Sequence, residues 1–179
     1  LKQRIEELKI GNGLDAGMDM GPLNNPAQRE RISQVIEATK DAHEGTILTG
    51  GCSMEDTPYD QGLFFRPTLV ADVTPESRLM SEEVFGPVLP VMAVPDLDTA
   101  IREANRTRYG LGASVWTNNL HTAKRAFDEV NAGIIWINRH LTVPPEIPFG
   151  GMNENGIGRE NGLHALDSYS RTKTLLLNW

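Results

Sequence analysis

The chain has 179 residues, of which 39% are apolar and 23% charged, with a formal net charge of -7. This length and composition are typical of a globular chain with one hydrophobic core, and the acidic excess leaves no basic surface for nucleic acid or anionic lipid. No apolar run approaches the roughly 20 residues of a membrane-spanning helix. The single cysteine can neither pair within the chain nor head a zinc cluster. We therefore expect a cytoplasmic protein without a metal, a nucleic-acid partner or a membrane partner.

The first ten residues have the pattern of the last turns of a helix, because Leu1, Ile5 and Leu8 share one helical face. The pattern opens without an initiator methionine, so we expect further sequence before Leu1. A second, amphipathic helix is predicted from Pro26 to Glu44, with Asn25 as its N-cap.

Strands and helices then alternate along the chain. We expect helices after the capping residues Asp96 and Asn119, the second with Ala123, Phe127 and Val130 facing inward. The predicted strands cover residues 46–49, 67–73, 88–94, 112–117 and 134–138.

This alternation predicts two βαβ units, and hence an α/β fold with a parallel-type sheet covered by helices. After a loop over residues 139–158, the chain ends in an extended apolar strand, Thr172 to Trp179. We therefore divide the chain into a domain of residues 1–170 and a terminal strand of residues 171–179.

Two patterns in the chain suggest chemistry that the residues around them do not support. Cys52 follows two glycines, has no histidine near it in sequence and lacks a cationic neighbour that would lower its pKa, so we interpret it as an ordinary cysteine. Gly156, Gly158 and Gly162 have the spacing GxGxxxG without a strand directly before them, which is not the dinucleotide-binding fingerprint. These glycines are expected to serve the backbone.

The run from Ser81 to Val88, SEEVFGPV, has two readings that the residues alone leave open. It could be a solvated turn that leads into a strand. A carboxylate in such a place can also accept hydrogen bonds from both hydroxyls of a ribose.

At this run the sequence resembles the aldehyde dehydrogenase superfamily, and nearly the whole chain matches the same family in order. Residues 82–88 resemble its E-E-[IV]-F-G-P-V signature. The other matching segments are Met20-Gly21-Pro22-Leu23 with Gln28, Asn105 with Tyr109-Gly110-Leu111, residues 133–138 (GIIWIN), and Pro148-Phe149-Gly150-Gly151 with Gly156, Gly158, Arg159 and Glu160. Asn153 and Asn155 depart from the family, which usually has Lys and Ser there.

The resemblance implies roles for individual residues. Glu83 would hold the nicotinamide ribose of NAD or NADP, Phe85 would pack against the nicotinamide, and Gln28, with Arg31 as a weaker candidate, would touch the ribose. Phe149 would line the substrate tunnel, with the loop from Arg139 to Glu146 at its mouth.

The implied reaction oxidises a small aldehyde to a carboxylic acid. A thiolate attacks the aldehyde, hydride passes to NAD(P)+ and water hydrolyses the thioester. In the family the catalytic cysteine, the general base and the nucleotide-binding domain lie upstream of the position of Leu1. We therefore expect no catalytic residue and no activity in these 179 residues alone.

The resemblance also implies a homo-oligomer joined through the C-terminal strand. Two alternatives stay open. One is a noncatalytic fragment that only self-associates, and the other is an acylating, coenzyme A-dependent semialdehyde dehydrogenase.

Overall fold

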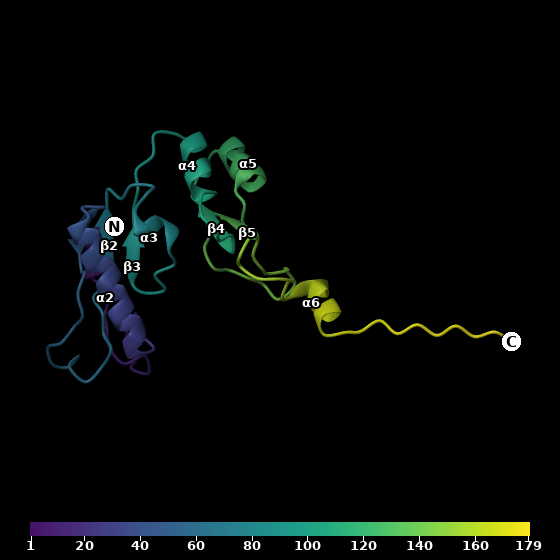
Figure 1. Ribbon diagram of the computed structural model, residues 1–179, viewed down its shortest axis with the longest axis horizontal. Helices are drawn as coiled ribbons and strands as arrows, with labels where there is room; N and C mark the ends of the chain where they lie inside the picture. Colours follow the sequence, from purple (N-terminus) through teal and green to yellow (C-terminus); the bar gives the residue numbers. More distant parts are fainter. The chain divides into compact units, whose positions relative to one another are not determined.

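Helix α2, Pro26–Asp41, is the longest element of the computed structural model, which describes residues 1–179 (Figure 1). The side-chain oxygen of Asn25 accepts a hydrogen bond from the backbone N–H of Gln28 at 2.8 Å, which confirms the predicted N-cap. The helix ends at Asp41, somewhat before the predicted end at Glu44. Its start is therefore fixed by a side chain that the sequence already identified.

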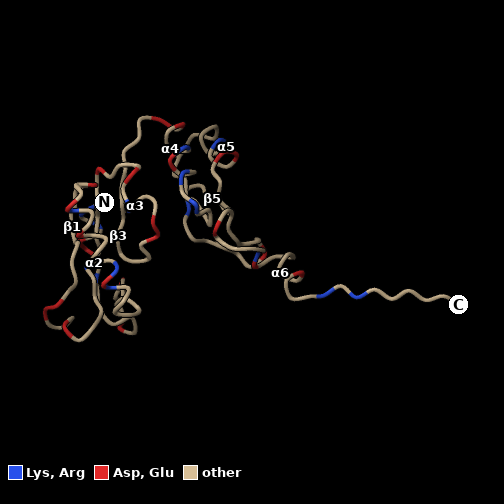
Figure 2. The backbone as a smooth tube through the Cα atoms, in the orientation of Figure 1, with Lys and Arg blue, Asp and Glu red and all other residues tan.

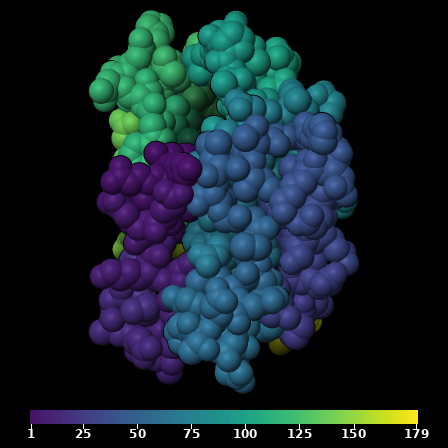
Figure 3. All heavy atoms as spheres, turned by 90° about the vertical axis from the view of Figure 1, so that its left-hand side faces the viewer, coloured from purple at the N-terminus to yellow at the C-terminus, as the bar shows by residue number.

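The chain forms two compact units, and the first, Leu1–Ala93, is built on a three-stranded sheet. Strand β2 is central, pairing antiparallel with β1 and parallel with β3. The elements of this unit besides α2 are α1 (Lys2–Glu6), β1 (Thr46–Thr49), β2 (Thr68–Ala71), α3 (Arg78–Ser81) and β3 (Val88–Pro90). Figure 3 shows one face of this unit, where the first residues of the chain (purple) lie beside later segments (blue).

The core of the first unit lies between α2 and the sheet. Helical spacing places Ile32, Val35 and Ile36 on one face of α2, where each is 3% exposed or less. They form one apolar cluster with Phe65, Val70, Val73, Leu79 and Val84. Because Val84 belongs to this cluster, the run of residues 81–88 packs against the core.

The second unit, Val94–Trp179, contains one parallel pair of strands. Its elements are α4 (Leu97–Ala104), β4 (Gly112–Val115), α5 (Leu120–Glu129), β5 (Ile134–Ile137) and α6 (Gly162–Ser168). Strands β4 and β5 are in register from Gly112 opposite Ile134 to Val115 opposite Ile137, and α5 connects them. This βαβ unit and the α/β class are confirmed.

The other predicted βαβ unit, β3-α4-β4, is wrong in its pairing. Strands β3 and β4 lie in different sheets, because β3 pairs with β2 instead. Strand β3 has only three residues, and its register with β2 runs from Thr68 opposite Val88 to Val70 opposite Pro90. Periodicity predicts that a strand exists but does not identify its partner.

Both predicted caps in the second unit are confirmed. Asp96 accepts a hydrogen bond from the backbone N–H of Thr99 at 2.8 Å, which lowers the pKa of the Asp96 carboxyl, and Asn119 accepts one from the backbone N–H of Thr122 at 3.1 Å.

The predicted inward position of Phe127 is wrong. Its side chain is 66% exposed, and Ala126 is the buried residue of α5.

After α6, which the sequence did not predict, residues 171–179 form neither helix nor strand within the chain, and all are exposed. The expected pairing of this segment, and the division at residue 170, stay predictions. Figure 2 shows both acidic and basic residues in each unit, scattered among the other residues. No helix has the length and apolarity needed to cross a membrane.

Candidate functional site

The centre of the candidate site in the first unit is the turn of residues 82–86, between α3 and β3. Val84 is 8% exposed and belongs to the apolar core, whereas the residues on either side of it, Glu83 and Phe85, are exposed. The turn is therefore anchored by its middle residue and presents a carboxylate and an aromatic ring to solvent.

Helix α2 holds the backbone of this turn through two polar side chains. The Nε2 amide of Gln28 donates hydrogen bonds to the carbonyl oxygens of Val84 at 2.7 Å and Phe85 at 2.9 Å. The guanidinium of Arg31 donates from Nη1 to the carbonyl of Val84 at 3.0 Å and from Nη2 to that of Glu83 at 2.8 Å. Three successive carbonyl oxygens are thus bound by side chains one helical turn apart.

Close packing adds a third constraint on the turn. A side-chain carbon on Gly86 would overlap the side chain of Ile32, so only glycine lets the turn lie this near to α2. Phe85 has a φ of 52°, in the left-handed region that a bulky residue rarely adopts and that costs about 1 kcal/mol or more. The bonds from α2 hold Phe85 in this conformation, with its ring 78% exposed.

The two neighbouring glutamates of the turn have different surroundings. Glu82 accepts hydrogen bonds from Arg78 at 3.0 and 3.4 Å and forms an ion pair with Arg31 at 4.0 Å. The hydrogen bond from Arg78 to Glu82 raises the pKa of the Arg78 guanidinium. The Glu83 carboxylate has no hydrogen bond or ion pair within the chain, and only its carbonyl is engaged. Glu82 therefore ties α3 to α2, and Glu83 is available to a ligand.

The structure brings three of the predicted site residues together, because Gln28 contacts the turn that carries Glu83 and Phe85. Both hydrogens of the Gln28 amide point to carbonyls of the turn, so a positioning role for Gln28 has direct geometric support. Its predicted contact with the cofactor stays a prediction, as do those of Glu83 and Phe85.

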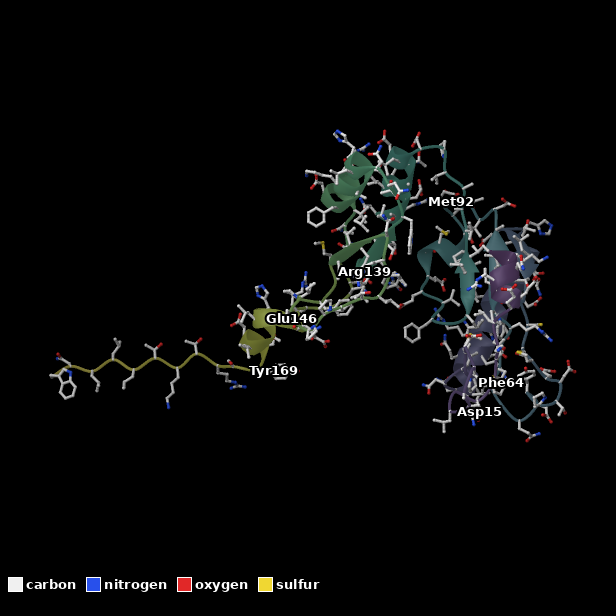
Figure 4. All side chains as sticks on the ribbon, turned by 180° about the vertical axis from the view of Figure 1, so that it is seen from behind. Asp15, Phe64, Met92, Arg139, Glu146 and Tyr169 are labelled. Carbon is white, nitrogen blue, oxygen red and sulfur yellow. The ribbon has the colours of Figure 1, made fainter.

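Phe149, which the sequence predicts to line the substrate tunnel, lies in the second unit. Its backbone forms a short antiparallel bridge with Glu160, with two N–H to carbonyl bonds of 2.7 Å. The half-buried ring lines a cavity of about 660 Å³ together with Leu111, residues 155–161 and Tyr169. Figure 4 labels Arg139 and Glu146, which bound the loop before Phe149, and Tyr169, which follows α6.

The two asparagines that depart from the family pattern stabilise this region. Asn153 accepts a hydrogen bond from Asn131 at 2.9 Å and donates one to the carbonyl of Tyr109 at 3.2 Å. Asn155 accepts a hydrogen bond from the backbone N–H of Gly110. Both therefore bind the turn that precedes β4.

The glycines nearby do serve the backbone as expected. Gly156 and Gly158 have φ values of 101° and 85°, which other residues rarely adopt.

Sequence reasoning missed the side chains that hold the loop of residues 139–146. The hydroxyl of Ser114 and Nδ1 of His140 form a hydrogen bond of 2.7 Å, and the indole N–H of Trp136 donates to the carbonyl of Thr142 at 2.8 Å. These residues come from two strands and the loop itself. No short motif brings them together in sequence, because the contacts depend on the β4–β5 pairing.

Cys52 is exposed and free, and its backbone carbonyl accepts a hydrogen bond from Arg66. The structure contains no group of three or more His, Cys, Asp or Glu side chains that could hold a metal ion.

The fold and the turn define a class: an α/β chain with a candidate ligand site, where an unpaired carboxylate lies beside an exposed aromatic ring. The family follows from comparison. A family model described as the aldehyde dehydrogenase family matches residues 1–175, and the chain belongs to this family.

Three relatives show how far the likeness extends. The betaine aldehyde dehydrogenase of Brucella anthropi is 41% identical over 98% of this chain, and the phenylacetaldehyde dehydrogenase of Pseudomonas fluorescens is 40% identical over 96%. The solved structure of betaine aldehyde dehydrogenase from Staphylococcus aureus in complex with NAD+ has a TM-score of 0.90 and 34% identity over 100% of this chain. The chain covers 36%, 34% and 37% of these three proteins, respectively.

Proposed function

We propose that the chain is part of an NAD(P)-dependent aldehyde dehydrogenase that oxidises an aldehyde to a carboxylic acid. The observation that carries the proposal is the turn of residues 82–86, where α2 binds the backbone carbonyls, leaves the Glu83 carboxylate unpaired and exposes the ring of Phe85. An energetically strained, exposed aromatic residue beside a free carboxylate is the kind of feature found at functional sites.

These residues fit the nicotinamide end of a dinucleotide. A carboxylate has two acceptor oxygens, which match the two hydroxyls of a ribose, and a fixed aromatic ring provides a flat surface for the nicotinamide. The dinucleotide, when bound, accepts a hydride from the substrate carbon. Glu83 and Phe85 orient it, and this orientation lowers the barrier because the reacting atoms are held in place.

The substrate side of the proposal rests on Phe149 and its cavity. A half-buried aromatic wall restricts the size and shape of an aldehyde that enters.

The nucleophile is proposed to lie outside these 179 residues, because Cys52 is an exposed thiol without a hydrogen-bonded base or a cationic partner. The cytoplasmic location stays a prediction.

The proposal predicts turnover of an aldehyde with NAD+ or NADP+ by an enzyme that carries this chain, with full activity retained in Cys52→Ser. Reduced cofactor is measured with betaine aldehyde, phenylacetaldehyde and aliphatic aldehydes, since two relatives are named for the first two. The 179 residues alone are expected to give no turnover. Loss of activity in Cys52→Ser, or turnover by the chain alone, would contradict the assignment of the nucleophile.

A second copy of the chain is the proposed partner of the C-terminal segment. Leu175, Leu176 and Leu177 are 76%, 91% and 65% exposed in an extended, unpaired stretch, and such an edge favours pairing with another strand. Deletion of residues 172–179 from the active enzyme is expected to lower its oligomeric mass in light scattering. Replacing Arg171 and Lys173 by alanine serves as the control, because it keeps the apolar residues. An unchanged mass after the deletion would rule out this interface.

A further inference from the structure

We infer that Arg31 is a positioning residue for the nicotinamide site and acts through Glu83. The inference rests on the proposed function and deepens it, because it names the group that sets the direction of the Glu83 carboxylate. The evidence is the set of contacts between α2 and the turn.

The position of Arg31 on α2 suits this role. Gln28, Arg31 and Ile32 are spaced at i, i+3 and i+4, so all three lie on the helical face that meets the turn. Ile32 packs against Gly86, and the two polar residues bind the carbonyls. The helix therefore provides one continuous surface that matches the turn.

The guanidinium has a geometry that a single-point donor lacks. Its two terminal nitrogens donate to two successive carbonyl oxygens, of Glu83 and Val84, at 2.8 and 3.0 Å. A planar, always charged fork holds both peptide planes in one geometry, whereas the three donors of a lysine ammonium rotate about a single nitrogen on a flexible stem. Binding the carbonyl of Glu83 fixes the backbone from which its carboxylate projects.

Glu82 completes the arrangement, since it lies near Arg31 and accepts hydrogen bonds from Arg78. Its charge favours a fixed guanidinium, so Arg31 is oriented before any ligand binds. Arg78 provides a matched comparison. It is a second arginine that binds Glu82, but its side chain has no hydrogen bond to the carbonyls of residues 83–85.

The test compares Arg31→Met, Arg31→Lys and Arg78→Met in the active enzyme, with and without Glu83→Gln. The dissociation constant for NAD+ is measured by calorimetry, together with kcat and KM. Arg31→Met is expected to weaken NAD+ binding and lower kcat on the order of tenfold, because a positioning loss affects both. Arg31→Lys should recover part of the loss, and Arg78→Met should weaken NAD+ binding and lower kcat less than Arg31→Met does, while lowering stability to urea.

The combination with Glu83→Gln decides whether Arg31 acts through Glu83. If it does, Arg31→Met has little further effect once the carboxylate is gone, so the two losses are not additive. A crystal structure of Arg31→Met without cofactor should also show Phe85 leaving its positive φ. Fully additive losses, or an Arg31→Met variant that binds NAD+ normally, would overturn the inference while the proposed function stands. A silent Glu83→Gln variant would instead refute the proposed function itself.

Discussion

Glu83→Gln is expected to slow hydride transfer on the order of 10²-fold in an active enzyme that carries this chain. The amide keeps the size of the side chain but has one acceptor oxygen where the carboxylate has two, so it cannot accept hydrogen bonds from both ribose hydroxyls equally well. Because the Glu83 side chain has no partner within the chain, the substitution removes no structural contact. Single-turnover measurements of reduced cofactor separate the hydride step from product release.

Glu82→Gln is the matched control for this prediction, because it makes the same chemical change one residue earlier. Glu82 binds Arg78 and lies near Arg31, so its replacement should lower stability to urea. The kinetic loss should be smaller than in Glu83→Gln, since the two bonds from Arg31 to the carbonyls persist. Equal kinetic effects of the two substitutions, or normal kinetics in Glu83→Gln, would remove Glu83 from the proposed site.

Helix starts could be predicted from single residues in this chain, because a cap is a local contact. Asn25, Asp96 and Asn119 each accept a hydrogen bond from the N–H three residues later, as the sequence indicates. Sheet pairing could not be predicted in the same way. The alternating pattern that places β3 before α4 is equally compatible with pairing to β2, and that choice depends on contacts far apart in sequence.

The sequence proposes which residues form the candidate site, but it does not predict the geometry in which they lie. Resemblance identified Glu83, Phe85, Gln28 and Phe149 from motifs. The motif does not distinguish the two adjacent glutamates by their surroundings. That distinction needs the position of Arg78, which lies on α3 and reaches Glu82 by helical spacing, and of Arg31 on α2.

The exposed position of Phe127 was missed for a related reason. Its spacing on α5 fits an inward face, but burial requires a surface to pack against. The sheet of the second unit has only two strands, and the side chain is 66% exposed. Periodicity thus predicts which residues share a face, and only tertiary structure decides what covers that face.

Phe149→Ala is expected to change which aldehydes the enzyme prefers, because the ring forms part of the wall of a cavity of about 660 Å³. Removing it enlarges the space and takes away an aromatic surface that can bind a cation, so the ratio of kcat/KM should shift from betaine aldehyde toward phenylacetaldehyde. A shift of roughly tenfold or more is reasonable, since a single methylene of fit is worth roughly 1–3 kcal/mol. Phe127→Ala is the control, because it removes the same side chain from an exposed position on α5 that does not line this cavity. The kcat/KM ratio is measured for both variants under the same conditions. If Phe149→Ala and Phe127→Ala leave the ratio equally unchanged, the cavity beside Phe149 does not receive the substrate.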